Sequence, residues 1–215
     1  MGERAALLLS GGLDSVVLLH DWLATHESKD LTALIIEAGL LNERYQTHFA
    51  KRHCLANRVH HEVLDLRGIQ KLMEGLVHPQ FTAMDEWDSV QPHGSALPVA
   101  IFAAVFRCHL EKIETLLVGL TLEQRWPNTS KFLDHIGTAF SLYAEDAQNV
   151  RVSAPFLDMS KSEIIKRGST IGVDFRETWS CYMGDHKHCG RCSSCIDRKT
   201  AFAASGIEDT TDYQS

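Results

Sequence analysis

The N-terminal segment constrains the fold most, because a short apolar run leads through two glycines directly into a helical pattern. The apolar run covers residues 5–9, the glycine turn covers 10–12, and apolar side chains then recur at helical spacing over about 14–25. A continuous apolar run that ends at glycine is typical of a strand buried on both faces. The chain is therefore expected to begin with a buried strand, a tight turn and a helix, which is the start of an α/β unit.

The same alternation continues along the chain. Further short apolar runs, each predicted to be a strand, cover 32–36, 59–66, 115–119 and 150–154. Helical patterns cover 42–57, 97–110, 131–144, 161–171 and 196–204. Strands that alternate with helices form parallel sheets with right-handed crossovers. The fold class predicted is α/β, a Rossmann-like parallel sheet with helices on both faces.

Three segments of this pattern carry more specific expectations. Residues 68–94 are poorly patterned and hold two prolines, which favours a loop or a lid. Residues 97–110 are apolar almost all round, which predicts a helix buried on several sides. Residues 120–130 are expected to form a loop before the next helix. We expect a main domain over 1–177 and a smaller segment over 178–215 packed on it.

Composition excludes several classes of function. The 215 residues carry a formal net charge of −7, which argues against a surface that binds duplex nucleic acid. No apolar run approaches the roughly 20 residues that a membrane-spanning helix needs. The N-terminal residues have no cleavable signal pattern, so a cytoplasmic protein is expected.

Four of the six cysteines crowd into a short C-terminal stretch, namely Cys181, Cys189, Cys192 and Cys195. Two C-x2-C spacings of this kind are typical of a closed, structural zinc site with four thiolate ligands. Lys187, Arg191 and Arg198 are placed to offset the surplus negative charge, and His186 and His188 are nearby competing ligands. An iron–sulfur cluster and a group of reduced buried thiols are the alternatives.

The glycine turn is a candidate phosphate-binding loop with the sequence Ser10-Gly11-Gly12-Leu13-Asp14-Ser15. Glycines let the backbone approach a ligand closely, and the N–H groups at a helix start attract anions. The sequence is neither a Walker loop nor a dinucleotide fingerprint, because it lacks Gly-Lys-Ser/Thr and G-x-G-x-x-G. The alternative is a glycine turn that caps a helix and binds nothing.

This string resembles the signature of the PP-loop ATP pyrophosphatases. The resemblance implies that ATP with Mg²⁺ binds on residues 10–15 and that a substrate oxygen is adenylated with release of pyrophosphate. Lys161 follows Ser160 at the start of a predicted helix, where Ser160 and Glu163 form a capping box. In the family a lysine at this place lies by the phosphates, which makes Asp14 and Lys161 the candidate catalytic residues. The alternative for Lys161 is a solvated side chain on a well-capped helix.

The candidate phosphate loop, the helix that begins with Ser160-Lys161 and the four-cysteine motif together resemble the QueC family of 7-cyano-7-deazaguanine synthases. The closest matches are Thr-Trp-Ser-Cys-Tyr at 178–182, Cys-Gly-Arg-Cys-Ser-Ser-Cys at 189–195 and Gly-Ile-Glu-Asp-Thr-Thr-Asp-Tyr at 206–213. The resemblance implies a homodimer that adenylates 7-carboxy-7-deazaguanine for attack by ammonia. A second activation would then dehydrate the amide to a nitrile.

The middle of the chain departs from the family pattern. The segments Glu-Ala-Gly-Leu at 37–40, Gln-Pro-His-Gly-Ser-Ala at 91–96 and Trp-Pro-Asn-Thr at 126–129 replace Asp-Tyr-Gly-Gln, Pro-Ala-Arg-Asn and Tyr-Pro-Asp-Cys. The candidate substrate-binding residues are Glu37, Glu123, Arg125, Trp126 and Asn128. The ring of Trp126 is expected either to stack on a flat base or to anchor the loop on the fold.

Two accounts of these departures stay open at the level of sequence. In one, the reaction is unchanged; in the other, a QueC-like paralogue stops after one activation and joins the deazaguanine acyl group to another amine, for example on a protein. Two further functions are a tRNA-modifying adenylase and a non-catalytic zinc-binding interaction module. The product, whether nitrile, amide or conjugate, the pathway and the oligomeric state are not determined by the sequence.

Overall fold

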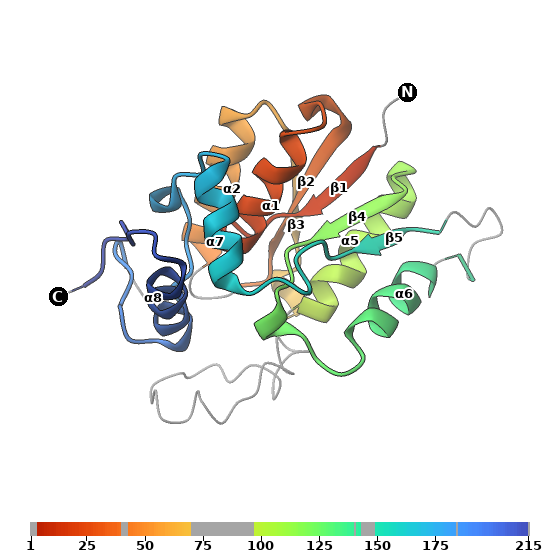
Figure 1. The fold of residues 1–215 in the computed structure, drawn as a ribbon. Helices are drawn as coiled ribbons and strands as arrows, with labels where there is room; N and C mark the ends of the chain where they lie inside the picture. Colours follow the sequence, from red (N-terminus) through yellow and green to blue (C-terminus); the bar gives the residue numbers. More distant parts are fainter. Residues whose placement is uncertain are drawn as a thin grey trace.

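A five-stranded parallel sheet forms the centre of the molecule (Figure 1). The computed structural model describes residues 4–39, 43–69, 97–139, 141–142, 149–183 and 185–214. The strands are β1 Ala5–Leu8, β2 Leu31–Glu37, β3 His60–Asp65, β4 Thr115–Val118 and β5 Arg151–Ser153. Their order in the sheet is β3-β2-β1-β4-β5, and all neighbouring pairs are parallel. The order changes direction between β1 and β4, which is where open α/β sheets bind ligands.

The burial of the central strands explains why their sequences are continuously apolar. All four residues of β4 and three of the four in β1 are buried, because helices cover both faces of the sheet there. Leu8 pairs with Leu34 of β2 and Val118 of β4, so the three strands end at one edge. The edge strands β3 and β5 are more exposed and accordingly more polar.

Helices lie on both faces of the sheet, as predicted (Figure 1). On one face pack α1 Leu13–Leu23, α2 Glu43–Ala56 and α7 Lys161–Thr170. On the other face pack α5 Leu97–Glu111 and α6 Thr129–Ala139. The C-terminal helix α8, Ser193–Ser205, packs on α7 and adds Ala201 and Phe202 to the core of the first face.

The predicted burial of the helix at 97–110 on several sides is wrong. Helix α5 buries one stripe, while Phe102, Phe106 and Leu110 are 50%, 45% and 54% exposed. A single helix on a sheet fully buries only the side chains that face the sheet, so an apolar pattern all round a helix does not by itself predict burial on several sides.

Other differences concern the bounds of elements. The segment predicted as a loop at 120–130 contains a short 3-10 helix, Leu122–Gln124, and α6 begins at Thr129. Helix α6 ends at Ala139, which is earlier than the expected 144. Most of the predicted lid, from 70 onward, lies outside the described residues.

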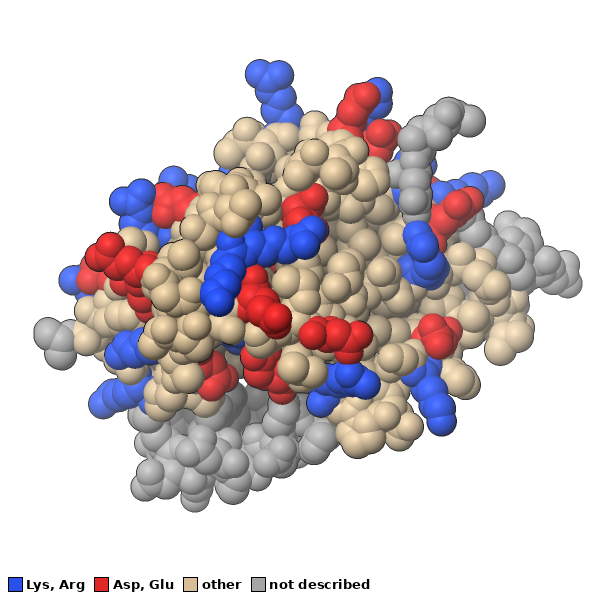
Figure 2. Space-filling model, in the orientation of Figure 1, with Lys and Arg blue, Asp and Glu red and all other residues tan. Residues whose placement is uncertain are grey.

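The surface agrees with the mixed charge of the sequence. Figure 2 shows acidic and basic side chains interspersed over the face drawn, without a broad field of either sign. Within the described part of the chain, the helices are all too short or too polar to cross a membrane.

Candidate functional site

The phosphate-loop candidate joins the end of β1 to the start of α1. Gly11 has a φ of +75°, a conformation that favours glycine. The hydroxyls of Ser10 and Ser15 lie 3.0 Å apart, and the Ser15 hydroxyl donates to the Gly12 carbonyl at 3.1 Å. The Gly12 N–H donates back to the Ser10 hydroxyl at 3.2 Å. These bonds hold residues 10–15 in one compact turn at the helix N-terminus.

The surroundings of the loop leave no room for larger residues. A Cβ added at Gly11 would lie 2.2 Å from the Gln46 carbonyl oxygen of α2. A Cβ at Gly119, just after β4, would lie 3.1 Å from backbone atoms of Ser15. The loop therefore lies against α2 on one side and the end of β4 on the other, at the point where the strand order changes direction.

Asp14 and Lys161 form an ion pair from two helix N-termini, with Lys161 Nζ 3.7 Å from Asp14 Oδ2. Their side chains are only 16% and 17% exposed. Burial raises the pKa of Asp14 in spite of the opposing attraction of Lys161. Burial alone would lower the pKa of Lys161, but the attraction of Asp14 and of Asp197 raises it instead. Asp14 Oδ1 is buried and has no hydrogen-bond donor among the described residues.

Helix α7 begins as the sequence predicts. Ser160 is its N-cap, and it forms a reciprocal capping box with Glu163. The Lys161 N–H donates to the Glu123 carboxylate at 2.8 Å, so the 3-10 helix at 122–124 is joined to the first turn of α7. Burial would raise the pKa of Glu123, but hydrogen bonds from the Lys161 N–H and the Thr121 hydroxyl lower it. A charged carboxylate thus lies beside the Asp14–Lys161 pair.

The other expected substrate residues have different surroundings. Glu37 is half-buried at the C-terminal end of β2. Arg125 forms an ion pair with Asp158 at 2.6 Å. The ring of Trp126 packs on the core of the second face and lies edge-on to Phe132, with centroids 5.6 Å apart.

Asn128 is exposed just before α6, and its carbonyl accepts from the Phe132 N–H. The altered segment at 91–96 lies outside the described residues, as does residue 40 of the altered segment at 37–40. Of the substrate candidates, the structure therefore brings Glu123 to the Asp14–Lys161 pair.

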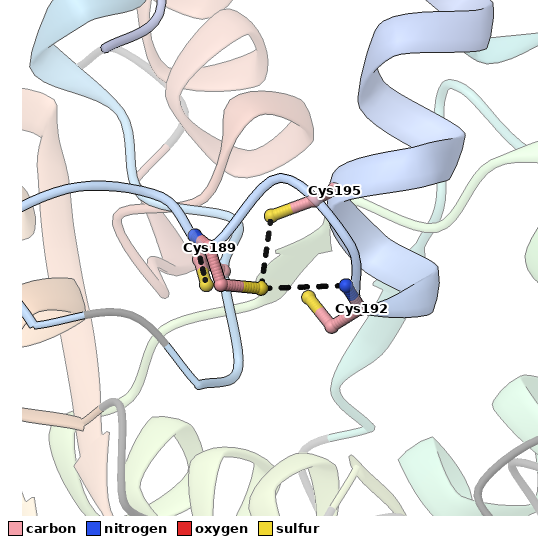
Figure 3. Close-up of side chains that lie close together, drawn as sticks. Cys189, Cys192 and Cys195 are labelled. Atoms are coloured by element: carbon pink, nitrogen blue, oxygen red, sulfur yellow. Dashed lines mark hydrogen bonds between the residues drawn. The ribbon is translucent and has the colours of Figure 1, made fainter. Parts of the chain in front are cut away.

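The four clustered cysteines converge in space. All are buried, and their sulfurs lie within 4.8 Å of one another. Figure 3 shows Cys189, Cys192 and Cys195 pointing toward a common centre, from a loop and the first turn of α8. The Cys189 N–H donates to Cys181 Sγ at 3.2 Å, and the Cys192 N–H donates to Cys189 Sγ at 3.3 Å. Hydrogen bonds from Cys192 and Cys195 lower the pKa of Cys181 from its ordinary value.

This sulfur set fits one tetrahedral metal ion. A tetrahedral ion with metal–sulfur distances of about 2.3 Å places its sulfurs about 3.8 Å apart. The Cys189 and Cys195 sulfurs are 3.9 Å apart. The cluster therefore needs little movement to bind a metal ion, and it has the burial of a closed site.

The three basic side chains expected to offset the thiolate charge have different surroundings. Arg198 is 1% exposed and donates to the Phe175 carbonyl and the Thr178 hydroxyl. Lys187 forms an ion pair with Asp212 at 3.1 Å. Arg191 is exposed. Of the three side chains, only Arg198 is buried. The sequence did not indicate this burial, because arginine is rarely buried without partners and its partners are known only from the fold.

Sequence reasoning also missed the role of Trp179. Its backbone N–H donates to the Gly11 carbonyl of the phosphate loop at 2.9 Å. A tryptophan in an otherwise polar cysteine segment was the available signal. Its contact with residue 11 could not be read from spacing.

The sheet order, the glycine–serine loop at its switch point and the ion pair beside it define a PP-loop type of α/β protein. The U34-tRNA thiolase NcsA from Methanococcus maripaludis, solved with its [4Fe-4S] cluster, has a similar fold with a TM-score of 0.53 at 13% identity. The match covers 95% of this chain and 65% of that one. The NMN synthetase from Francisella tularensis gives a TM-score of 0.51 at 12% identity, over 97% and 79% of the two chains.

The chain belongs to the QueC family, because the family model described as queuosine biosynthesis protein QueC matches residues 4–206. The 7-cyano-7-deazaguanine synthase of Methanothermobacter thermautotrophicus is 31% identical over 98% of this chain and 99% of its own. The 7-cyano-7-deazaguanine synthase 1 of Mesorhizobium japonicum is 31% identical over 98% and 94%. The resemblance inferred from the motifs is confirmed.

Proposed function

We propose that the chain is an ATP-dependent ligase of the QueC type, which adenylates the carboxylate of 7-carboxy-7-deazaguanine for attack by ammonia or another amine. The names of its relatives, which match over nearly the full length, support the substrate class. The observation that carries the proposal is the buried Asp14–Lys161 pair at the start of two helices, directly beside the glycine–serine loop.

Each residue of this group has a distinct task in the proposed reaction. The N–H groups of residues 10–15 and the hydroxyls of Ser10 and Ser15 bind the ATP phosphates. Lys161 offsets the negative charge that develops on the leaving pyrophosphate. Glu123 orients Lys161 by accepting its backbone N–H.

Magnesium would be held by Asp14, whose buried Oδ1 has no donor among the described residues. An uncompensated buried carboxylate oxygen is costly unless a cation or donor reaches it. The ion would supply charge compensation for the phosphate oxygens of ATP.

The amine that attacks the adenylate distinguishes two versions of this function. Two of the three replaced segments have described residues, 37–39 at the end of β2 and 126–129 after β4, near the ends of the strands where a ligand is expected. We propose that these replacements favour an amide or an amine conjugate over the nitrile. Efficient formation of the nitrile from ammonia would contradict that choice.

For the cysteine cluster we propose one structural zinc ion. The short sulfur separations and the four buried thiols support a closed tetrahedral site. A [4Fe-4S] cluster, as in NcsA, places four irons between the thiolates and needs the sulfurs farther apart than a single ion does.

The test uses the full chain with ATP, magnesium and 7-carboxy-7-deazaguanine, with and without ammonia, followed by pyrophosphate detection and mass spectrometry of products. Pyrophosphate release that depends on the deazaguanine is expected. Release that depends on tRNA instead would favour the tRNA-modifying alternative, and no release would favour the non-catalytic one.

A matched pair of lysine variants in α7 sharpens the test. Lys161→Met should lower pyrophosphate release by about 100-fold or more, because removal of one preorganised charge at a reacting phosphate costs this much. Lys166→Met, on the exposed side of the same helix, should release pyrophosphate at nearly the wild-type rate. Equal rates for the two variants would remove Lys161 from the proposed site.

A further inference from the structure

The peptide of Trp179 lies directly on the phosphate loop. Its N–H donates to the Gly11 carbonyl at 2.9 Å, and its carbonyl oxygen would be 3.6 Å from a Cβ at Gly12. Gly11 is therefore enclosed between the Trp179 peptide and the Gln46 carbonyl of α2. The Trp179 ring stacks on Tyr45 of the same helix, with centroids 4.3 Å apart. If Trp179 moves away, the Gly11 carbonyl loses this donor and the loop loses one of its two neighbours.

Trp179 is joined just as closely to the cysteine cluster. Only Ser180 separates it from Cys181, and its indole N–H donates to the Cys181 carbonyl at 2.8 Å. The Ser180 N–H donates to His188 Nε2 at 3.1 Å, and the His188 ring lies 4.4 Å from the Trp179 ring. The segment that contacts the loop is thus continuous with the first cysteine of the cluster.

Arg198 holds this segment from the other side of the cluster. It lies in α8, one turn after Cys195, and is 1% exposed. Its Nη1 donates to the hydroxyls of Thr178 at 2.9 Å and Ser180 at 3.0 Å, on either side of Trp179. Its Nη2 donates to the Phe175 carbonyl at 2.8 Å. A buried guanidinium is tolerated when its donors are used, and here they fix the backbone around Trp179.

We propose that metal binding at the cysteine cluster and nucleotide binding at the phosphate loop are energetically coupled through Trp179, with Arg198 as the positioning residue. This rests on the proposed function, which assigns ATP to the loop and zinc to the cysteines. A metal ion orders the segment that carries Cys181 and so holds the Gly11 carbonyl in its place. Without the ion, nucleotide binding has to order the loop as well. Coupling between two sites is reciprocal, so the nucleotide must also retain the metal.

The experiment measures the rate of zinc release from the full zinc-loaded chain to a zinc-selective colorimetric chelator. Release is followed with and without the magnesium complex of a non-hydrolysable ATP analogue. The analogue should slow release by about fivefold or more. By calorimetry, its Kd for the zinc-depleted chain should be about fivefold or more above its Kd for the zinc-loaded chain.

Arg198→Lys separates positioning from mere structural support. It should keep one zinc per chain, yet the analogue should change its zinc-release rate little. Arg4→Lys makes the same chemical change at an exposed position before β1 and should behave as the wild type. If Arg198→Lys does not fold, Ser180→Ala removes one of the two hydroxyls bound by Nη1 and should reduce the effect of the analogue partly.

The outcomes are distinguishable. If the zinc-loaded wild type binds the analogue, but zinc release is unchanged and the Kd of the analogue is the same with and without zinc, the coupling is wrong and the proposed function stands. If it does not bind the analogue at all, both are overturned. If Arg198→Lys is less heat-stable but its release rate still responds as the wild type does, Arg198 is structural and its positioning role is overturned.

Discussion

Gly11 combines two constraints at a single residue. Its φ of +75° disfavours any residue with a Cβ, and an added Cβ would lie 2.2 Å from a backbone oxygen of α2. Gly172 has almost the same φ, +78°, but no atom within 4 Å of an added Cβ. The two glycines therefore separate the effect of backbone strain from that of close packing.

Gly11→Ala should lower the free energy of unfolding by about 2–4 kcal/mol, the sum of left-handed strain and overpacking. It should also abolish nucleotide binding, because the loop must move away from α2. Gly172→Ala should cost about 1 kcal/mol and leave nucleotide binding unchanged. Denaturant titration and calorimetry measure both quantities, and equal losses in the two variants would contradict the close approach.

The hydrogen-bonded pair of half-buried His20 and buried His53 gives a second residue-scale prediction. His53 Nε2 lies 2.9 Å from the Glu177 carbonyl, so it carries the proton, and His53 Nδ1 accepts from His20 Nε2 at 3.1 Å. Burial lowers the pKa of both rings from the ordinary 6.5. At His53 the charge of Arg52 also lowers the pKa, while Glu177 and Asp174 oppose the shift. The folded state thus favours both rings neutral.

Because the unfolded chain then takes up protons that the folded chain excludes, the free energy of unfolding should fall as the pH drops below about 6.5. His53→Gln keeps an N–H for the Glu177 carbonyl but does not titrate, so the fall should be shallower in this variant. His60→Gln, at an exposed position, should keep the wild-type slope. The check is denaturant unfolding at a series of pH values; identical slopes for all three proteins would contradict it.

At the scale of elements, the ring of Trp126 anchors the segment that connects β4 to α6. Trp126 is partly buried against the second-face core and lies edge-on to Phe132 of α6. The Thr129 hydroxyl closes the turn between them by accepting from the Trp126 N–H at 2.8 Å. These contacts match the anchoring interpretation of Trp126, while stacking on a substrate stays a prediction.

Trp126→Ala should therefore lower the free energy of unfolding by about 2–3 kcal/mol, somewhat below the cost for a fully buried tryptophan. Leu122→Ala, at an exposed position of the same segment, should cost well under 1 kcal/mol. Unfolding is measured beside the KM for 7-carboxy-7-deazaguanine. A raised KM without loss of stability would instead assign the ring to the substrate.

At the scale of the whole molecule, the cysteine cluster connects the C-terminal segment to the main core. Helix α8 carries Cys195 at one end and contributes Phe202 to the first-face core at the other. Closed thiolate sites couple metal binding to folding. The homodimer, the cytoplasmic location and the domain boundary after 177 stay predictions.

Removal of the metal should lower the midpoint of thermal unfolding by about 5 °C or more, since 1 kcal/mol corresponds to about 2–4 °C in a chain of this size. Elemental analysis should find one zinc per chain, lost in Cys195→Ser and unchanged in Cys54→Ser. Both thiols are buried, so the pair controls for burial. Iron in place of zinc would contradict the assignment.

Features formed by neighbouring residues could be predicted from the sequence alone. The strand, glycine turn and helix at the N-terminus and the capping box of α7 depend on residues a few positions apart, and the four converging cysteines lie within the short stretch 181–195. Their spacing limits what the backbone can do, so local pattern sufficed.

Only the tertiary structure decided which distant residues meet. The carboxylate of Glu123 at the start of α7 and the Trp179 peptide on Gly11 come from elements far apart in sequence. Lys161 also reaches Asp14 from a distant element, and its place beside the loop was expected only from the family resemblance. The sequence pattern also did not predict the exposed face of α5, because it records which residues are apolar and not which element packs against them. Such contacts depend on how helices pack across a sheet, which periodicity does not specify, because it describes each element separately.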